Sequence, residues 1–306
     1  MHPLPEGRLL LAFSGGPDSL GLAAALRGRD VLLAYLDHRL RGTRASRHER
    51  AAVRAAARAL GLPLLRARLA PATASEASAR AARHGALRAM ARRHGCAAVL
   101  TAHTADDRAE TILLRLLRGT GLRGLAALPP RARVAGLPLC RPAVGERRDA
   151  LRARGAGLPA VEDRTNRSTA YARARVRGLL LPALREHLGA DPVPGLCALG
   201  DLAAAVRASL ERCARGGDPA AAPAPLFPYL VEARRRAAGA AGAPYSAAVY
   251  EALRAFLAGR GEGAFRAARG ETWVRGRGGV ALTPGPCPAS RPPSRGAGGT
   301  PPRPRP

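Results

Sequence analysis

The chain almost completely lacks several residue types. Its 306 residues include no lysine and no glutamine, and asparagine and isoleucine occur once each, at Asn166 and Ile112. Alanine, arginine, glycine and proline are abundant instead, which indicates a genome rich in G and C. A residue type that survives such a bias at one place is a candidate for function. Asn166 is therefore a candidate site residue.

Long apolar runs are also missing. No stretch approaches the roughly 18 to 20 uncharged apolar residues of a membrane span. The N-terminus, MHPLPEGR, does not join a basic region to an apolar core, so no signal peptide and no membrane attachment are predicted. We therefore expect a cytoplasmic protein. Its length suits one large domain with a smaller one, or two modest domains.

Cysteine is scarce and scattered. The five cysteines are odd in number and never form a C-x-x-C pair; they are Cys96, Cys140, Cys197, Cys213 and Cys287. Neither a disulfide framework nor a zinc site is expected.

Acidic residues are few compared with basic ones. The chain has 22 Asp and Glu against 50 basic residues, a formal net charge of +28. Genome bias explains arginine in place of lysine, but it does not explain the excess of basic over acidic residues. The positive electrostatic potential of such a chain attracts nucleic acid, so an RNA or DNA partner is favoured.

Strand-length apolar runs alternate with helical patterns over the first 118 residues. We predict strands at 9–13, 31–36, 64–69 and 97–101, and helices at 18–27, 45–60, 76–94 and 106–118. This alternation predicts an α/β fold with a parallel, Rossmann-like sheet flanked by helices. Ligands of such sheets lie beyond the C-terminal strand ends. Ser14–Ser19, Asp37-His38 and His103–Glu110 should therefore converge on one crevice.

The pattern weakens after Pro129. We predict helices at 146–154, at 172–187 with a kink or break at Pro182, at 201–213, and two within 226–257. Short strand-like pieces follow at 265–282. The predicted domains are a catalytic nucleotide-binding domain at 1–187, a small, mostly helical domain at 188–283, and a disordered Pro/Arg-rich tail at 284–306.

The stretch SGGPDS follows the first strand and opens a helix. Its members are Ser14, Gly15, Gly16, Pro17, Asp18 and Ser19. Glycines let backbone N–H groups approach a ligand, and a helix N-terminus favours anions, so the loop predicts phosphate binding. It is not a Walker A loop, which requires a lysine. Asp18 would repel phosphate unless Mg²⁺ bridges the two. A plain tight turn, and an ordinary helix-terminal acid at Asp18, remain alternatives.

A second cluster lies in the stretch TAHTADDRAET. His103, Asp106, Asp107 and Glu110 fall within eight residues, and the three acids share one side of the first helical turn. Acids also suit a helix N-terminus, so a capping role remains open for Asp106 or Asp107. Capping does not account for all three acids and the histidine beside a phosphate crevice.

These stretches carry a resemblance to a known family. SGGPDS resembles the SGGxDS loop of PP-loop ATP pyrophosphatases, which cleave ATP between the α and β phosphates. Further stretches look like tRNA(Ile)-lysidine synthetase; in order they are LDHRLR, ASARAARHGAL, AHTADDRAETILLRLLRGTGLRGLAALPP, RPAVG, VEDRTN and RARVRGLLLPAL. The resemblance covers residues 9–186 well and continues weakly to about 283.

The resemblance implies a reaction and a set of site residues. The family activates the wobble cytidine of the CAU anticodon of tRNA(Ile) with ATP, releasing pyrophosphate, and L-lysine then displaces AMP to give lysidine. It implies that Ser14–Ser19 hold the pyrophosphate, and that Asp18, Asp107 and Glu110 serve Mg²⁺ and the intermediate, with Asp18 and Asp107 as metal ligands. The implied contacts to substrate or tRNA are Asp37, His38, Arg80, Arg83, His103, Asp106, Asp163, Asn166, Arg173, Arg175 and Arg177.

Some positions depart from the family pattern, and other functions remain open. The family usually has Gln at Arg108, Tyr at His84 and Asn at Ala174. The alternatives are a PP-loop tRNA sulfur-transfer enzyme, an amide-forming synthetase of small metabolites, and an inactive relative that only binds RNA. The oligomeric state also remains open, a homodimer included.

Overall fold

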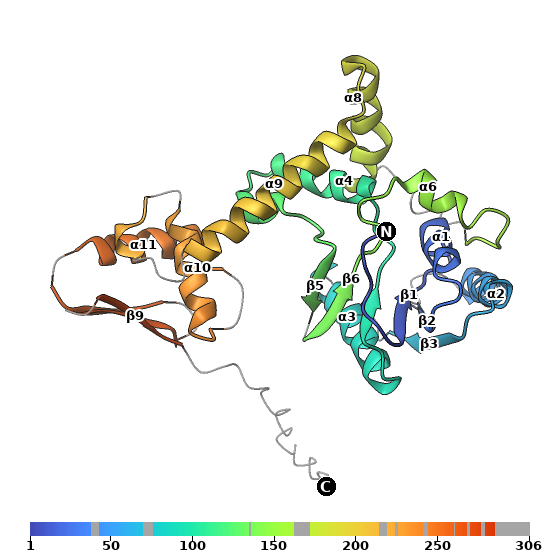
Figure 1. Cartoon of the computed structure of the whole chain (residues 1–306), viewed down its shortest axis with the longest axis horizontal. Helices are drawn as coiled ribbons and strands as arrows, with labels where there is room; N and C mark the ends of the chain where they lie inside the picture. Colours follow the sequence, from blue (N-terminus) through green and yellow to red (C-terminus); the bar gives the residue numbers. More distant parts are fainter. Residues whose placement is uncertain are drawn as a thin grey trace, which may run out of the picture. The chain divides into compact units, whose positions relative to one another are not determined.

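A computed structural model of the whole chain forms two compact units, Met1–Ala204 and Ala205–Pro306. It describes residues 1–37, 43–69, 76–134, 136–161, 172–213, 219–223, 226–240, 244–259, 261–267, 270–276 and 279–284. His38, Asp163, Asn166 and the predicted tail from 285 onward lie outside the described residues. Figure 1 shows the ribbon.

The first unit is built on a six-stranded sheet. Its strands are β1 (Leu9–Ala12), β2 (Val31–Asp37), β3 (Leu64–Arg68), β4 (Ala98–Leu100), β5 (Arg131–Val134) and β6 (Leu137–Cys140). Their order is β3-β2-β1-β4-β6-β5, and all neighbours pair in parallel except β5, which is antiparallel to β6. The predicted α/β class is confirmed. The strands β5 and β6 were not predicted, because β6 has only four residues and includes Pro138.

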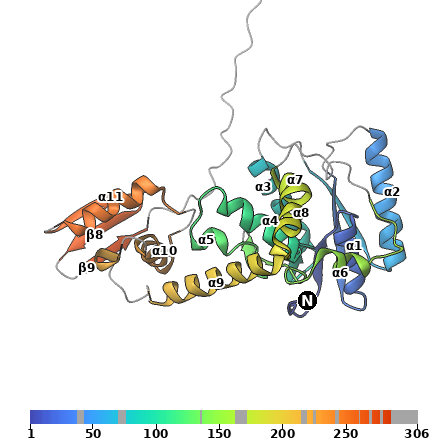
Figure 2. The same cartoon turned by 90° about the horizontal axis from the view of Figure 1, so that it is seen from above.

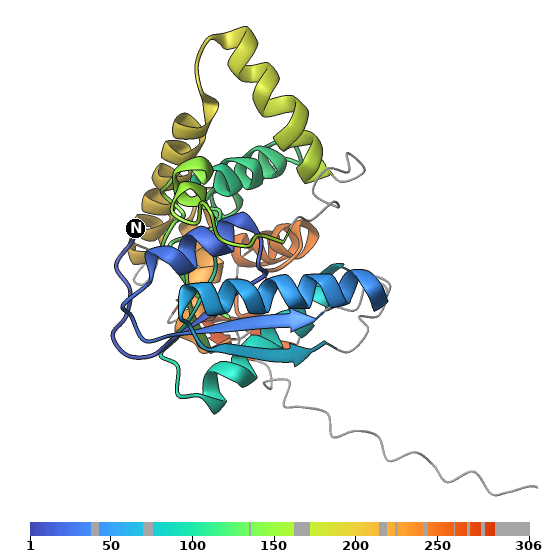
Figure 3. The ribbon, with the colours of Figure 1, turned by 90° about the vertical axis from the view of Figure 1, so that its right-hand side faces the viewer.

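Helices cover both faces of this sheet because β1 and β2 are apolar on both sides. Leu9 and Leu11 pack with Leu22, Val53 and Leu151 on one face. That face is covered by α1 (Pro17–Ala25), α2 (Thr43–Leu60) and α6 (Arg148–Ala153). The alternate residues of the same strands face α3 (Glu76–Arg93). Figure 3 shows α2 lying along β2 and β3.

The strand order reverses at β1. The chain runs from β1 outward to β2 and β3, and α3 then leads to β4 on the other side of β1. At such a reversal the connections after β1 and β4 leave in opposite directions and open a crevice at the C-terminal strand ends. This crevice contains the site described below.

Glycines bring α6 unusually close to α1. A Cβ on Gly21 would lie 2.0 Å from the Leu151 carbonyl oxygen, and one on Gly155 would lie 2.9 Å from the Gly21 nitrogen. Only glycine allows this approach at position 21. The contact packs the second half of α6 against the middle of α1.

The rest of the first unit is helical. It includes α4 (Ala105–Leu116), α5 (Leu122–Leu125), α7 (Ala172–Arg175), the π-helical turn η2 (Val176–Leu180), α8 (Leu181–Leu188) and the first part of α9 (Pro192–Cys213). Figure 2 shows α7 beside α4. The π turn ends at Leu180, two residues before Pro182, which lacks an N–H group. The break expected there is therefore a local change of helix type.

Helix α9 is continuous through the boundary between the units. The sequence placed a domain boundary at 187/188, whereas the compact units divide at 204/205, because Val193 packs on Ala105 and Ala109 of α4. The stretch Pro192–Arg212 is long and apolar enough to cross a membrane by length and composition, with mean hydropathy 1.3. Only 17% of this stretch is buried, and Leu199, Leu202 and Val206 are among its exposed apolar residues.

The second unit combines helices with a small sheet. Helices α10 (Phe227–Ala237) and α11 (Ala247–Ala258) accompany the short 3-10 helix η3 (Pro219–Ala221) and three antiparallel strands, β7 (Gly263–Arg266), β8 (Thr272–Gly276) and β9 (Gly279–Thr283). Trp273 is fully buried in its core with Phe227 and Leu253. A buried guanidinium, that of Arg235, pairs there with Glu232 and Glu271.

Candidate functional site

A cavity of about 360 Å³ opens at the C-terminal ends of β1, β2, β4 and β6. Several residues singled out in the sequence line this cavity. They are Ser14, Asp18, Ser19, Arg80, Arg83, His103, Asp107 and Arg173. The structure therefore brings the SGGPDS loop and the HTADD stretch to one crevice. Asp37 instead pairs with Arg50 at 2.9 Å.

The SGGPDS loop is a tight turn at a helix N-terminus. Gly15 has a φ of +77°, and a Cβ there would lie 2.8 Å from Val53 and Val161 side chains. Gly16 is the N-cap of α1 and has no side-chain cap. The Ser19 hydroxyl donates to the Gly16 carbonyl at 2.9 Å and lies 3.2 Å from the Ser14 hydroxyl. The uncapped helix start and two hydroxyls suit an anion.

Asp18 lies beside two arginines of α6. Arg152 Nε donates to Asp18 Oδ1, and Arg148 Nε lies 3.7 Å from Asp18 Oδ2. Arg152 is 41% exposed, so its pairing with Asp18 is a weak, solvent-screened contact. Asp18 can therefore exchange this partner for a ligand.

Asp107 has both a capping and an electrostatic role. Its Oδ2 accepts from the N–H and the hydroxyl of Thr104, each at 2.9 Å, in a capping box at the start of α4. Its Oδ1 accepts from Arg148 at 2.9 Å. Although burial acts the other way, Arg148 and the Thr104 N–H hold the pKa of the Asp107 carboxyl below its usual range. Asp107 therefore stays negative in the cavity.

Asp106 links α4 to α6. Its Oδ2 accepts from the backbone N–H of Arg148 at 2.7 Å, and its Oδ1 accepts from Arg147 at 3.0 Å. The capping role left open for these acids is therefore present for Asp107, which caps its own helix, whereas Asp106 instead bonds the first residue of α6.

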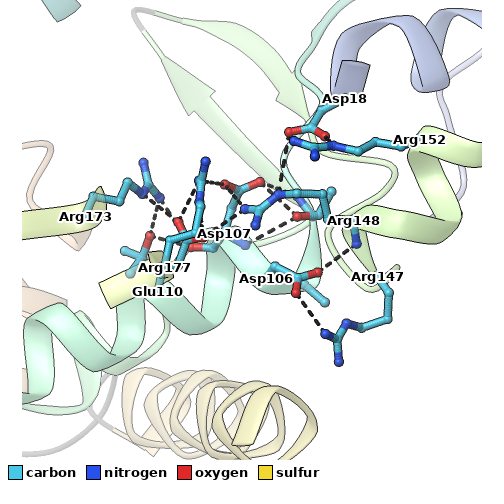
Figure 4. Close-up of polar contacts among 12 residues, drawn as sticks. Asp18, Asp106, Asp107, Glu110, Arg147, Arg148, Arg152, Arg173 and Arg177 are labelled. Atoms are coloured by element: carbon cyan, nitrogen blue, oxygen red, sulfur yellow. Dashed lines mark hydrogen bonds and ion pairs between the residues drawn. The ribbon is translucent and has the colours of Figure 1, made fainter. Parts of the chain in front are cut away.

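Glu110 is fully buried among arginines and does not line the cavity. Its Oε1 accepts from Arg148 at 2.9 Å and from Arg177 Nε at 2.7 Å. Its Oε2 accepts from Arg173 at 3.1 Å and from a second Arg177 nitrogen at 2.9 Å. Figure 4 shows these three guanidinium groups around the carboxylate. In this geometry the Glu110 carboxylate contacts arginines and does not reach the cavity.

The histidines that line the cavity are held neutral. The pKa of His103 is lowered to about 4 by burial and by nearby arginines, among them Arg141, against an opposing effect of Asp107. His103 Nδ1 and the Thr101 hydroxyl share a 2.8 Å hydrogen bond. Burial and the neighbouring Arg80 and Arg83 likewise lower the pKa of His84. Near neutral pH, His103 can accept or donate a hydrogen bond without adding charge.

Arg175, a predicted contact, and Arg108, a departure from the family pattern, both lie away from the cavity. Arg175 is exposed and lines a separate apolar groove with Leu117 and Leu179. Arg108, where the family usually has Gln, points to α9, with its Nε donating to the Ala127 carbonyl at 3.2 Å and its terminal nitrogen lying 2.6 Å from Asp201. The side chain at this departing position is therefore not part of the cavity lining.

Sequence reasoning missed several arginines. Arg147, Arg148 and Arg152 contact the predicted acids, and Arg141 lines the cavity. Arg141 opens the RPAVG stretch, which carried part of the resemblance. Arg148 had no local signal, because its role depends on the approach of α6 to α1.

The donor set fits a magnesium ion that arrives with a nucleotide. Mg²⁺ is usually held by one or two carboxylates together with phosphate oxygens and water. Asp18 and Asp107 both line the cavity beside the loop, and among the described residues Asp18 is paired with the exposed Arg152 and, at a longer distance, with Arg148. Among the described residues, no group of three or more His, Cys, Asp or Glu side chains could hold a metal. The two carboxylates suit a shared ion and not a closed protein cage.

Comparison with known proteins gives consistent similarities. A family model described as PP-loop domain matches residues 1–184. The chain is 43% identical over 184 residues to a tRNA(Ile)-lysidine synthase of Novosphingobium aromaticivorans, covering 58% of this chain and 56% of that protein. It is 41% identical over 226 residues to a tRNA(Ile)-lysidine synthase of Bradyrhizobium sp., covering 70% and 62%. The chain thus spans less than two thirds of the length of these relatives.

A solved structure shares the fold. The U34-tRNA thiolase NcsA from Methanococcus maripaludis, with its [4Fe-4S] cluster, matches with a TM-score of 0.51 at 17% identity, covering 63% of this chain and 72% of that one. At this identity the likeness shows the fold alone.

Proposed function

Because the chain belongs to the PP-loop domain family, we propose that it is a cytoplasmic ligase that uses ATP to join L-lysine to the wobble cytidine of the CAU anticodon of tRNA(Ile). The observation that carries the proposal is the cavity at the strand reversal, where the SGGPDS loop faces Asp107 and His103. The names of relatives that are 41–43% identical supply the substrate.

The reaction has two steps. The cytosine carbonyl oxygen attacks the α-phosphorus of ATP, and pyrophosphate leaves with the bonding electrons. The lysine amine then attacks the ring carbon that bears this oxygen. The bond between that carbon and the oxygen breaks, AMP leaves with the bonding electrons, and the amine loses a proton. Adenylation is needed because a carbonyl oxygen is a poor leaving group, whereas AMP is a good one.

The residues of the cavity suit both steps. Ser14–Ser19 would hold the pyrophosphate, and Arg173 would offset negative charge on the departing phosphate. An acid near the lysine amine would recognise its charged form, and His103, kept neutral, would accept a hydrogen bond. Asp18 and Asp107 would hold Mg²⁺, which supplies positive charge to the phosphates when bound.

Further residues would act through contacts around the cavity. Glu110 would position the arginines that surround it, and Asp106 would position α6. Arg80 and Arg83 line the cavity and suit ATP or tRNA phosphate. The remaining proposed contacts to substrate or tRNA are Asp37, His38, Asp163, Asn166, Arg175 and Arg177.

The second unit and the net charge of +28 would serve tRNA binding. Salt should therefore weaken tRNA binding much more than ATP binding, because each phosphate contact releases counterions. A homodimer is compatible with this role.

The sulfur-transfer alternative is disfavoured by the cysteines that the structure describes. Burial raises the pKa of the Cys96, Cys140 and Cys197 thiols, whereas a reactive cysteine needs a lowered pKa. The basic charge disfavours an amide-forming synthetase of small metabolites. The complete phosphate loop disfavours an inactive RNA-binding relative.

The test is transfer of labelled lysine to tRNA(Ile) with a CAU anticodon, with ATP and Mg²⁺, and methionine tRNA as the substrate control. Asp18→Ala should abolish adenylation, seen as pyrophosphate release, and retain tRNA binding. The matched control is Asp149→Ala, an exposed acid on α6. Normal lysidine formation by Asp18→Ala would show that the Mg²⁺ assignment is wrong. AMP release without lysine transfer would indicate another nucleophile.

A further inference from the structure

A set of exposed arginines lies on α2 and on the edge strand β3, outside the lining of the cavity. On α2, positions 47, 51, 54 and 58 recur every three or four residues, so they share one face of the helix, and all four are exposed. Three of the four are arginines, and β3 adds two more exposed arginines. We call this set the α2–β3 surface; its members are Arg47, Arg54, Arg58, Arg66 and Arg68.

The strand register places the two β3 arginines on the same side of the sheet as α2. Arg68 lies beside Asp37 in the parallel pairing of β2 with β3, and Arg66 comes two residues earlier on the same strand. Asp37 Oδ2 accepts from Arg50 of α2 at 2.9 Å, so this side of the sheet faces α2. Neighbours in register, and residues two apart on a strand, point to the same face. Arg66 and Arg68 therefore lie next to α2, which runs along β2 and β3 (Figure 3).

Acidic partners are missing from this surface. The only acid of α2 is Glu49, which lines the cavity, and β3 has none. Among the described residues, no acid forms an ion pair with any of the five arginines. Partly exposed arginines elsewhere do have such partners, for example Arg8 with Asp30 at 3.0 Å and Arg207 with Glu211 at 3.4 Å.

Like charges on one helical face oppose folding. Arg54 and Arg58 are four residues apart, a spacing at which two like charges destabilise a helix. Genome bias accounts for arginine in place of lysine, but it does not remove acids, because the chain has 22 of them. A face that is kept positive at a cost in helix stability is explained by an anionic partner.

The α2–β3 surface begins beside the cavity and leads away from it. Glu49 lines the cavity, and Arg50 pairs with Asp37 at the C-terminal end of β2. The helix then runs back along the sheet, and it rises about 16 Å from Arg47 to Arg58. An RNA strand with its reactive nucleotide in the cavity can therefore continue over this surface with its neighbouring phosphates.

The exposed face of α2 suits a phosphate backbone better than a lipid surface. A helix that lies in a membrane interface presents large apolar side chains opposite its charges. The apolar side chains of α2, among them Val53 and Leu60, are instead buried against the sheet. The exposed positions between the arginines hold only His48, Ala51 and Ala59. Guanidinium groups pair well with phosphate, because their N–H donors match two phosphate oxygens at once.

We propose that the α2–β3 surface binds the phosphate backbone of the RNA substrate outside the cavity. The inference rests on the proposed function for the identity of that RNA, and it adds where the strand is held beyond the reacting nucleotide. Contacts to phosphate position a nucleic acid and carry no sequence information. The surface therefore contributes affinity for any tRNA, and selection of the anticodon is left to the cavity.

The test is a triple variant of the full chain, Arg54→Gln, Arg58→Gln and Arg66→Gln. Glutamine removes the charge and has a helix propensity close to that of arginine. Binding of tRNA(Ile) with a CAU anticodon should weaken by about tenfold or more at physiological salt, and the slope of log K against log[salt] should become shallower by about 2–3. Methionine tRNA should lose the same affinity. The KM for ATP, and kcat at saturating tRNA, should remain within about twofold, because the cavity is intact.

A second triple variant controls for the net charge. Arg92→Gln and Arg93→Gln at the end of α3, with Arg133→Gln on β5, remove three exposed charges from other parts of the first unit. This variant should keep the wild-type affinity and salt slope. The α2–β3 variant should also unfold at or above the wild-type Tm, because repulsion between like charges is reduced. If the triple variant is less stable, Arg54→Gln alone should still make the slope shallower by about 0.7–0.9.

The outcomes separate this proposal from the proposed function. If the α2–β3 variant binds tRNA with the wild-type affinity and slope, or if the control variant loses as much, the surface is refuted whether or not lysine is transferred. If the α2–β3 variant loses tRNA binding while the wild-type protein transfers no lysine, the surface stands and the ligase function fails. If the variant instead loses binding to phosphatidylserine vesicles and keeps tRNA binding, the partner is a membrane and the proposal is wrong.

Discussion

The fully buried carboxylate of Glu110 permits a sharp test of what holds the site together. In Glu110→Gln the side chain keeps its size but loses its charge, and its new NH₂ group faces arginine donors. Two of the four N–H···O bonds to the carboxylate then lose their acceptor oxygen, and the three guanidinium groups lose the negative charge that they share. Removing one partner of a buried ion pair costs about 3–5 kcal/mol, because the other charge remains unpaired.

This loss should appear in the first unit only. For a unit of this size, each kcal/mol changes Tm by about 2–4 °C, so the expected decrease is roughly 6–20 °C. The single tryptophan, Trp273, lies in the core of the second unit and reports on that unit separately. Far-UV circular dichroism should show an earlier transition in Glu110→Gln, whereas the tryptophan fluorescence transition should remain in place.

The control for this experiment is Glu186→Gln, an exposed acid of α8 in the same unit. It should change the free energy of unfolding by less than about 0.5 kcal/mol. A surface substitution changes Tm by roughly 2 °C at most. If the Tm of Glu110→Gln lies within about that range of the wild-type Tm, the arginine cluster does not depend on Glu110 and the reasoning is refuted.

Two further predictions concern packing and pH. Gly21→Ala should destabilise the first unit by about 3 kcal/mol or more, because the new methyl would lie 2.0 Å from the Leu151 oxygen. Its control, Gly85→Ala, lies in open space on α3 and should stabilise the unit by up to about 1 kcal/mol. Thermal unfolding of both variants checks this. The pKa of His103 is lowered to about 4, so as pH falls the unfolded chain binds a proton at this histidine before the folded chain does. The free energy of unfolding should therefore fall by up to about 3 kcal/mol as pH decreases from 6.5 to 4. Denaturant titrations of the wild-type protein and of His103→Asn check this, and the variant should show a smaller fall in the free energy of unfolding.

Local patterns predicted the front half of the fold well. The strands from β1 to β4 and their helices follow from apolar runs bounded by glycine, and the parallel order brings the SGGPDS and HTADD stretches to one cavity. The β6 strand and Arg141 could not be predicted, because a four-residue strand with a proline is recognised only by its pairing with β4.

The roles within the acidic cluster were less accessible from sequence. Helical spacing showed that Asp107 and Glu110 are neighbours, but not that Asp107 faces the cavity while Glu110 is enclosed by arginines. That distinction depends on α6 and α7, which approach from distant parts of the chain. The assignments of His38, Asp163 and Asn166 remain predictions.

The π-helical turn at Val176–Leu180 sets the rotational phase between the arginine-bearing segment and α8. Each residue of an α-helix advances by about 100° and 1.5 Å, so one additional residue in a turn rotates the preceding residues by about that angle relative to the later ones. Arg173 and Arg177 therefore reach Glu110 from a segment whose phase differs from that of α8. Insertion or deletion of a single codon in this turn would redirect the arginines without altering any residue that contacts Glu110.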